Sequence, residues 1–134
     1  MLVILRALVL LAGIFFVLKG ADFLIDPAGA GSDFGMHAAG IAGLASIRAD
    51  MTAFFLIVGV GLVWGGWARK GDPLLVSAAL MGIALFGRLV SLLVDGPYDH
   101  FWAPMLVEAV VAVLALIGSR MLPHHAFEPE DDEG

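Results

Sequence analysis

The sequence predicts an all-α integral membrane protein, an antiparallel four-helix bundle with both termini in the cytoplasm. Hydrophobic residues make up 60% of the 134-residue chain, and charged residues make up only 15%. The apolar residues gather in four long runs with polar breaks between them, which is typical of a polytopic membrane protein of one domain. These runs predict spans at residues 2–18, 47–67, 74–95 and 103–122, followed by an acidic cytoplasmic tail at 123–134.

The first span, residues 2–18, ends at Lys19-Gly20. An Ala-Gly-Ala sequence at 28–30 has the form of a signal-peptidase site, but charged residues separate it from the apolar run by more than the usual spacing. We therefore expect the run to be kept as a membrane helix. The connection that follows is rich in Gly, Pro and Asp and is predicted to be a loop. Residues 36–46 either form an interfacial helix or extend the second span outward, and their composition slightly favours the extension.

The second and third spans are predicted to form a hairpin, because the turn between them is very short. In the second span Gly61 and Gly65 form a G-x-x-x-G pair, which permits close helix packing in membranes. Asp72 is the expected N-cap of the third helix, with Pro73 in its first position. Gly96 is suited to the left-handed conformation that ends many helices.

Basic side chains set the predicted orientation. The N-terminus, the turn between the second and third spans and the C-terminal flank together hold four Lys or Arg residues, and the opposite side holds two. The positive-inside rule therefore places both termini in the cytoplasm. The residues on the cytoplasmic side are Arg6, Arg69, Lys70 and Arg120, and those on the outer side are Lys19 and Arg48.

Arg88 lies inside the third span, where an unpaired guanidinium costs on the order of 2.5–3.5 kcal/mol and therefore needs a partner. At ~1.5 Å per residue, Arg88 lies about 10 Å inside the outer boundary, and Glu108 of the fourth span lies about 7–8 Å inside it. Because the two residues are nearly level, Glu108 is the predicted partner. Ser91, one turn from Arg88, is a further candidate for a hydrogen bond with it.

Arg48, Asp50 and Asp95 lie near the same outer boundary, so we expect them to form one polar cluster with Arg88 and Glu108. One interpretation is structural, with the Arg–Glu pair fixing helix register. Another is a pocket for an anionic or polar headgroup, and a third is a relay for proton or ion translocation. These interpretations stay open. The candidate pocket-lining residues are Phe54, Phe55, Met81 and Phe86.

Other classes of site find little support. The chain has no cysteine, which excludes disulfides and thiolate catalysis. The four histidines have no H-x-x-x-H or E-x-x-H spacing, so no metal site is predicted. None of Ser46, Ser77, Ser91 and Ser119 has a nearby histidine in its segment to act as a base, and no basic patch indicates nucleic acid. We therefore expect no cofactor and a non-enzymatic role.

Several short motifs carry a resemblance to a known family. They are Ala45-Ser46-Ile47-Arg48-Ala49-Asp50, Phe86-Gly87-Arg88-Leu89, Asp95-Gly96-Pro97 and Glu108 in the last span. Through them, roughly residues 1–120 resemble the small bacterial four-helix membrane proteins grouped as domain of unknown function 4345. The resemblance implies the membrane fold and supports the polar residues. That family has no assigned activity, so the resemblance implies no chemistry.

Little of the chain lies outside the predicted spans, which leaves scant room for a catalytic domain. We therefore expect an accessory or structural subunit of a larger assembly in a bacterial inner membrane. It would contact membrane lipids and either partner membrane subunits or copies of itself. The alternative is a lipid- or small-molecule-binding protein, such as a transporter or an enzyme, that uses a polar pocket in the outer half of the bundle.

Overall fold

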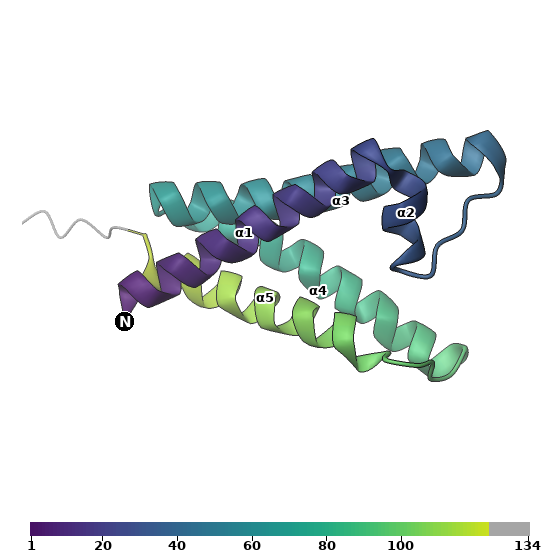
Figure 1. The fold of residues 1–134 in the computed structure, drawn as a ribbon. Helices are drawn as coiled ribbons and strands as arrows, with labels where there is room; N and C mark the ends of the chain where they lie inside the picture. Colours follow the sequence, from purple (N-terminus) through teal and green to yellow (C-terminus); the bar gives the residue numbers. More distant parts are fainter. Residues whose placement is uncertain (124–134) are drawn as a thin grey trace, which may run out of the picture.

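The computed structural model describes residues 1–123, which form five α-helices and no strand (Figure 1). Four of the helices are long and apolar enough to cross a membrane, which indicates a multi-pass membrane protein. These are α1 (Leu2–Ile25), α3 (Gly40–Ala68), α4 (Gly71–Val94) and α5 (Trp102–Met121), and a short α2 (Pro27–Ser32) follows α1. The all-α prediction is therefore confirmed. All of the predicted acidic tail except Pro123 lies outside the described residues.

The first membrane helix is longer than predicted, because α1 runs on past Lys19 and Gly20 to Ile25. Gly20 lets α1 approach α3 so closely that an added Cβ would lie 3.2 Å from the backbone nitrogen of Leu56. Phe23, one turn further on, is fully buried. Packing against α3 therefore overrides the helix-ending signal of a charge followed by a glycine.

The connection after α1 also differs from the prediction of a loop. Asp26 begins the helix α2, where its Oδ1 accepts a hydrogen bond of 3.0 Å from the backbone N–H of Gly29. Pro27 occupies the first turn of α2, where its missing N–H costs nothing. An Asp N-cap followed by Pro is thus sufficient for one short helix in an otherwise Gly-rich segment.

The starts of the next two helices lie outside the predicted spans. Helix α3 begins at Gly40, so residues 40–46 extend the second span, as the sequence slightly favoured. Helix α4 begins at Gly71 with Lys70 as its N-cap, and the predicted capping role of Asp72 is wrong. At the other end of α4, Gly96 has a φ of 94°, the left-handed conformation expected of it.

Helices α1 and α3 pack side by side, and the start of α3 extends beyond the end of α1 (Figure 1). Residues early in α1 meet residues late in α3: Arg6 donates hydrogen bonds to the carbonyls of Gly66 and Trp67, at 2.9 and 2.8 Å. At the opposite end, Arg48 of α3 donates a 3.1 Å hydrogen bond to the carbonyl of Leu24 in α1. Two arginines thus fasten the α1–α3 pair at both ends.

The α4–α5 pair joins the α1–α3 pair through small residues of α3. An added Cβ on Gly61 would lie 2.8 Å from the carbonyl oxygen of Pro73, and Gly65 packs against Leu74. The predicted G-x-x-x-G pair therefore lies between two helices of the same chain. Figure 1 shows the two pairs close together near the N-terminus and the α3–α4 turn, and diverging toward the end that carries α2.

Candidate ligand-binding pocket

A pocket of about 510 Å³ lies where the two helix pairs diverge, and all four long helices contribute to its wall. Its lining is mainly apolar, and aromatic rings form much of it. The aromatic lining residues are Phe15, Phe16, Phe34, Phe54, Phe55 and Tyr98. Four polar or charged residues interrupt this lining: Lys19, Arg88, Ser91 and Glu108. A mostly apolar cavity with a few polar groups is the usual form of a small-molecule site in proteins.

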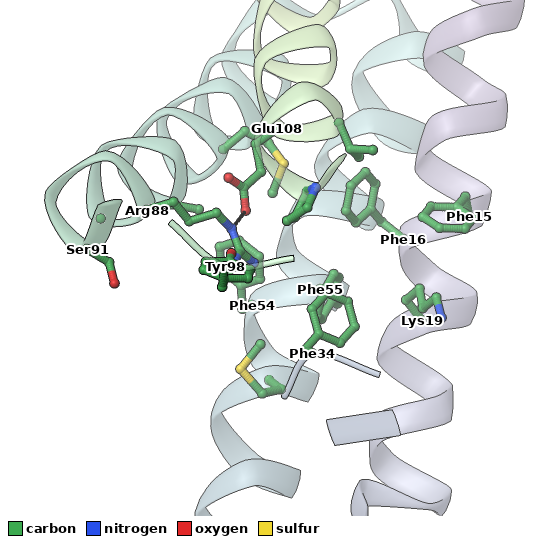
Figure 2. Close-up of a pocket in the computed structure, with 16 residues that line it drawn as sticks. Phe15, Phe16, Lys19, Phe34, Phe54, Phe55, Arg88, Ser91, Tyr98 and Glu108 are labelled. Atoms are coloured by element: carbon green, nitrogen blue, oxygen red, sulfur yellow. Dashed lines mark hydrogen bonds and ion pairs between the residues drawn. The ribbon is translucent and has the colours of Figure 1, made fainter. Parts of the chain in front are cut away.

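Arg88 and Glu108 form an ion pair across the pocket wall, with 2.6 Å between Arg88 Nε and Glu108 Oε1 (Figure 2). The depth argument from the sequence predicted this pairing. The two side chains are buried unequally, since that of Glu108 is 9% exposed and that of Arg88 is 31% exposed. The carboxylate is thus enclosed by the bundle, whereas part of the guanidinium remains open to the pocket.

The contact between the two charged groups is a single hydrogen bond and not a two-point fork. Glu108 Oε2 is buried, and no donor within residues 1–123 reaches it. In Figure 2 the end of the guanidinium is turned away from Glu108 and lies beside Tyr98. The geometry therefore orients the guanidinium, which interacts with Tyr98 as well as with Glu108.

Lys19 lies on the opposite side of the pocket from Arg88, with the rings of Phe16, Phe34 and Phe55 between them (Figure 2). Its side chain is half-buried, and no carboxylate of the described chain forms an ion pair with it. The sequence reading placed Lys19 at the end of the first span. Because α1 continues past Lys19 to Ile25, Lys19 instead lies within a membrane-type helix. The sequence does not reveal this, because the charge and the glycine at 19–20 indicate a helix end there.

The other members of the predicted polar cluster do not line the pocket. Arg48 binds the carbonyl of Leu24, and Asp50 is exposed. Asp95 accepts a 2.8 Å hydrogen bond from Ser91 Oγ. Ser91 therefore binds Asp95, and the expected hydrogen bond from Ser91 to Arg88 is not formed. Positions near one boundary are not sufficient to bring side chains together when they face different sides of their helices.

An aromatic cluster forms the part of the pocket wall between Lys19 and Arg88. Phe55 stacks between Phe16 and Phe23, with ring centroids 5.8 and 5.3 Å away, and Phe34 lies at 5.6 Å. Of the predicted lining residues, Phe54, Phe55 and Met81 do line the pocket. Phe86 does not, because its side chain points away from the bundle and is 68% exposed.

Phe34 and Tyr98 were missed by sequence reasoning, since both lie outside the long helices and reach the pocket from connecting segments. Aromatic residues beside a membrane helix ordinarily indicate interface anchoring, so their position in the sequence does not point to a pocket. Within residues 1–123, no three His, Asp or Glu side chains gather as metal ligands.

Comparison with known proteins supports the resemblance noted in the motifs. The family model described as Domain of unknown function (DUF4345) matches residues 4–119, most of the chain. No curated protein and no solved structure matches the chain significantly.

Proposed function

We propose that this chain, which belongs to the DUF4345 family, is a non-enzymatic membrane protein that binds an amphipathic small molecule, such as a lipid, between its helix pairs. One observation carries the proposal: a largely apolar cavity formed by four membrane-type helices contains an ion pair and a further cation. Charged groups at membrane depth are costly, and they commonly mark a binding or transport path.

The size and lining of the pocket support a ligand rather than a packing defect. Its volume of about 510 Å³ lies within the range of roughly 300–1,000 Å³ that is usual for small-molecule sites. Aromatic side chains can cover an apolar body, and the polar residues can orient a head group. Ligands of this form are abundant in a bilayer, from which they can enter between the diverging helix pairs.

The proposed orientation is an antiparallel bundle in a bacterial inner membrane with both termini in the cytoplasm. It rests on the excess of basic residues at one end of the molecule, where Arg6 and Arg69 lie. Figure 1 supports it, because the N-terminus, the α3–α4 turn and the end of α5 lie at that same end. The pocket would then lie in the outer half of the membrane.

The accessory-subunit hypothesis is the second candidate. It is favoured by an apolar groove of about 400 Å³ on the α1–α3 face, lined by Val60, Val63, Trp64 and neighbours. A groove of this kind can accept either lipid chains or a helix of another subunit. The main pocket, which contains the partly buried charges, is more specific than this groove. We therefore prefer ligand binding to the accessory role.

Native mass spectrometry of the full chain, extracted in a mild detergent or polymer, tests both candidates. We expect small amphipathic molecules at a fixed stoichiometry. The variant Ala84→Phe, which adds a ring to the pocket wall, should lose them. The matched control Ala79→Phe, on an exposed face of the same helix, should retain them.

Recovery of the wild-type chain without any bound molecule, together with no uptake from added lipid, would contradict the binding proposal. Foreign protein subunits at a fixed stoichiometry would instead support the accessory role. A lone monomer or small homo-oligomer would contradict that role.

A further inference from the structure

We infer that the ligand of the pocket is an amphipathic anion, whose negatively charged head binds the end of the Arg88 guanidinium, with Lys19 as a second cation on the opposite side of the pocket. This inference rests on the proposed binding function and adds the charge of the ligand. Two cations line the pocket, Lys19 and Arg88, against the single carboxylate of Glu108. The formal charge of the lining is therefore +1, and an anionic head group would complete the balance.

Lys19 carries the first step of the argument. Its ammonium belongs to a helix long and apolar enough to span a membrane, about six residues or 9 Å before that helix ends. A cation on a membrane-type helix is stabilised by a partner or by access to water. Asp22, one turn further along α1, is exposed and forms no ion pair with Lys19. A ligand anion in the pocket would supply the missing partner.

Arg88 supplies the second cation. A guanidinium has five N–H donors in a planar fork, and Glu108 accepts from only one of them. The rest of the fork lies beside Tyr98, on the side away from the carboxylate (Figure 2). Glu108 is therefore a positioning residue, which holds the guanidinium by Nε so that its end can bind an oxygen acid.

The burial of Glu108 argues against a cationic ligand. Its Oε1 is engaged by Arg88 at 2.6 Å, and its Oε2 is shielded from any water-sized group. Asp95 is occupied by Ser91 and does not line the pocket. An ammonium head group would thus meet a lining of net positive charge, whereas a carboxylate or phosphate would find N–H donors at Arg88.

The lining between the cations fits the apolar part of such a ligand. Phe16 and Phe55 lie between Lys19 and the ion pair (Figure 2). Hydrocarbon packed against these rings would be removed from water together with them. The chemistry required is therefore a single anionic head on an apolar body, and a fatty carboxylate and a lipid phosphate monoester share it.

Four probes of equal chain length separate the inference from the function on which it rests: oleate, oleyl phosphate, oleyl alcohol and oleylamine. Each would be titrated into the delipidated full chain in a neutral detergent, at a pH where the acids are ionised. We expect the better of the two anions to bind at least about tenfold more tightly than the alcohol, and the amine to bind more weakly. The anion that binds more tightly identifies the head group.

The key variant is Lys19→Gln, which removes the charge and keeps most of the length. We expect it to reduce the anion-to-alcohol affinity ratio at least about threefold, because one of the two cations is lost. The matched control is Lys70→Gln, since Lys70 packs over Trp64, away from the pocket. It should leave the ratio unchanged.

Each outcome decides one level of the argument. Binding of none of the four probes would overturn the proposed function itself. Binding of oleyl alcohol or oleylamine as tightly as the anions would overturn the anion inference while the pocket stands. An unchanged ratio in Lys19→Gln would also overturn it, because the charge of Lys19 would then play no part in recognition.

Discussion

Arg88 of α4 and Glu108 of α5 are joined by one hydrogen bond of 2.6 Å, which places a guanidinium on the wall of an apolar pocket. The contact ties α4 to α5 where the helix pairs diverge from each other. It also fixes the direction of the guanidinium. A structural and a functional role are therefore both open to the same pair, and they predict different behaviour for substituted chains.

The pair can be tested by a double-substitution cycle. Glu108→Leu should lower the free energy of unfolding by about 1–3 kcal/mol, because Arg88 loses its partner in an apolar setting. Arg88→Met should cost at least as much, since Glu108 is the more deeply buried of the two. The double variant should recover most of the loss, because two apolar side chains then pack without an unpaired charge. Denaturant unfolding in mixed micelles measures each value.

The same double variant separates the two roles. If the pair serves ligand binding, the double variant should fold and yet lose its preference for oleate over oleyl alcohol. A double variant that folds and keeps that preference would make the pair purely structural. If the double variant loses as much unfolding free energy as the two single variants together, the two residues are not coupled at all.

The four long helices and the Arg88–Glu108 pair were predictable because they depend on local information. Hydropathy over about 20 residues identifies a span, and residue spacing along two such spans gives relative depth. The pair is held at a common depth, so one-dimensional reasoning was sufficient to find it. Phe55 and Met81 were also correctly placed in the pocket, because they lie in spans and face the bundle.

The remaining features depend on packing between segments far apart in the sequence. Lys19 lines the pocket only because α1 continues past Gly20, which is allowed by its close approach to Leu56. Phe34 reaches the pocket from the segment after α2, a helix that leads from the end of α1 toward the α4–α5 side (Figure 1). Arg48 and Asp50 failed to join the cluster because depth carries no information about direction around a helix axis.

The approach of α3 to α4 gives a second prediction. Gly61→Ala should lower the free energy of unfolding by about 1–3 kcal/mol, because its Cβ would meet Ser77 and the carbonyl of Pro73. The matched control is Gly82→Ala in α4, where an added Cβ meets nothing within 4 Å. That control should be neutral or slightly stabilising, since alanine favours a helix over glycine. Equal effects of the two substitutions in denaturant unfolding would contradict the packing assigned to Gly61.

The aromatic cluster gives a third prediction. Phe55→Ala should cost about 3 kcal/mol, because it removes a ring that stacks between Phe16 and Phe23 and leaves a cavity. It should also weaken binding of every oleyl probe, since the ring forms part of the pocket wall. Phe86→Ala provides the control, because this ring is 68% exposed and lies outside the pocket. Thermal unfolding and probe titration should show little change in the control. Comparable losses of stability and affinity in both variants would contradict the special role of the Phe55 cluster in the pocket wall.

The orientation gives a fourth prediction, and the absence of cysteine makes it simple to test. Single cysteines at Asp33, Asp72 and Asp99 are all at exposed positions, and none of them removes a basic residue that sets topology. With both termini in the cytoplasm, Asp33→Cys and Asp99→Cys should react in intact cells with a maleimide that cannot cross the membrane. Asp72→Cys, beside the α3–α4 turn, should react only after the cells are permeabilised.

The labelling pattern also bears on the ligand, because Asp33 and Asp99 each directly adjoin a residue that lines the pocket, Phe34 and Tyr98. Labelling of these two sites from outside would place the opening of the pocket toward the outer face, where an amphipathic anion could enter from the outer leaflet or from beyond it. The reverse pattern would place the opening at the cytoplasm, so the ligand would have to come from the inner leaflet or the cytosol. Labelling of Asp33→Cys and Asp99→Cys on different sides would contradict the antiparallel arrangement of the four spans.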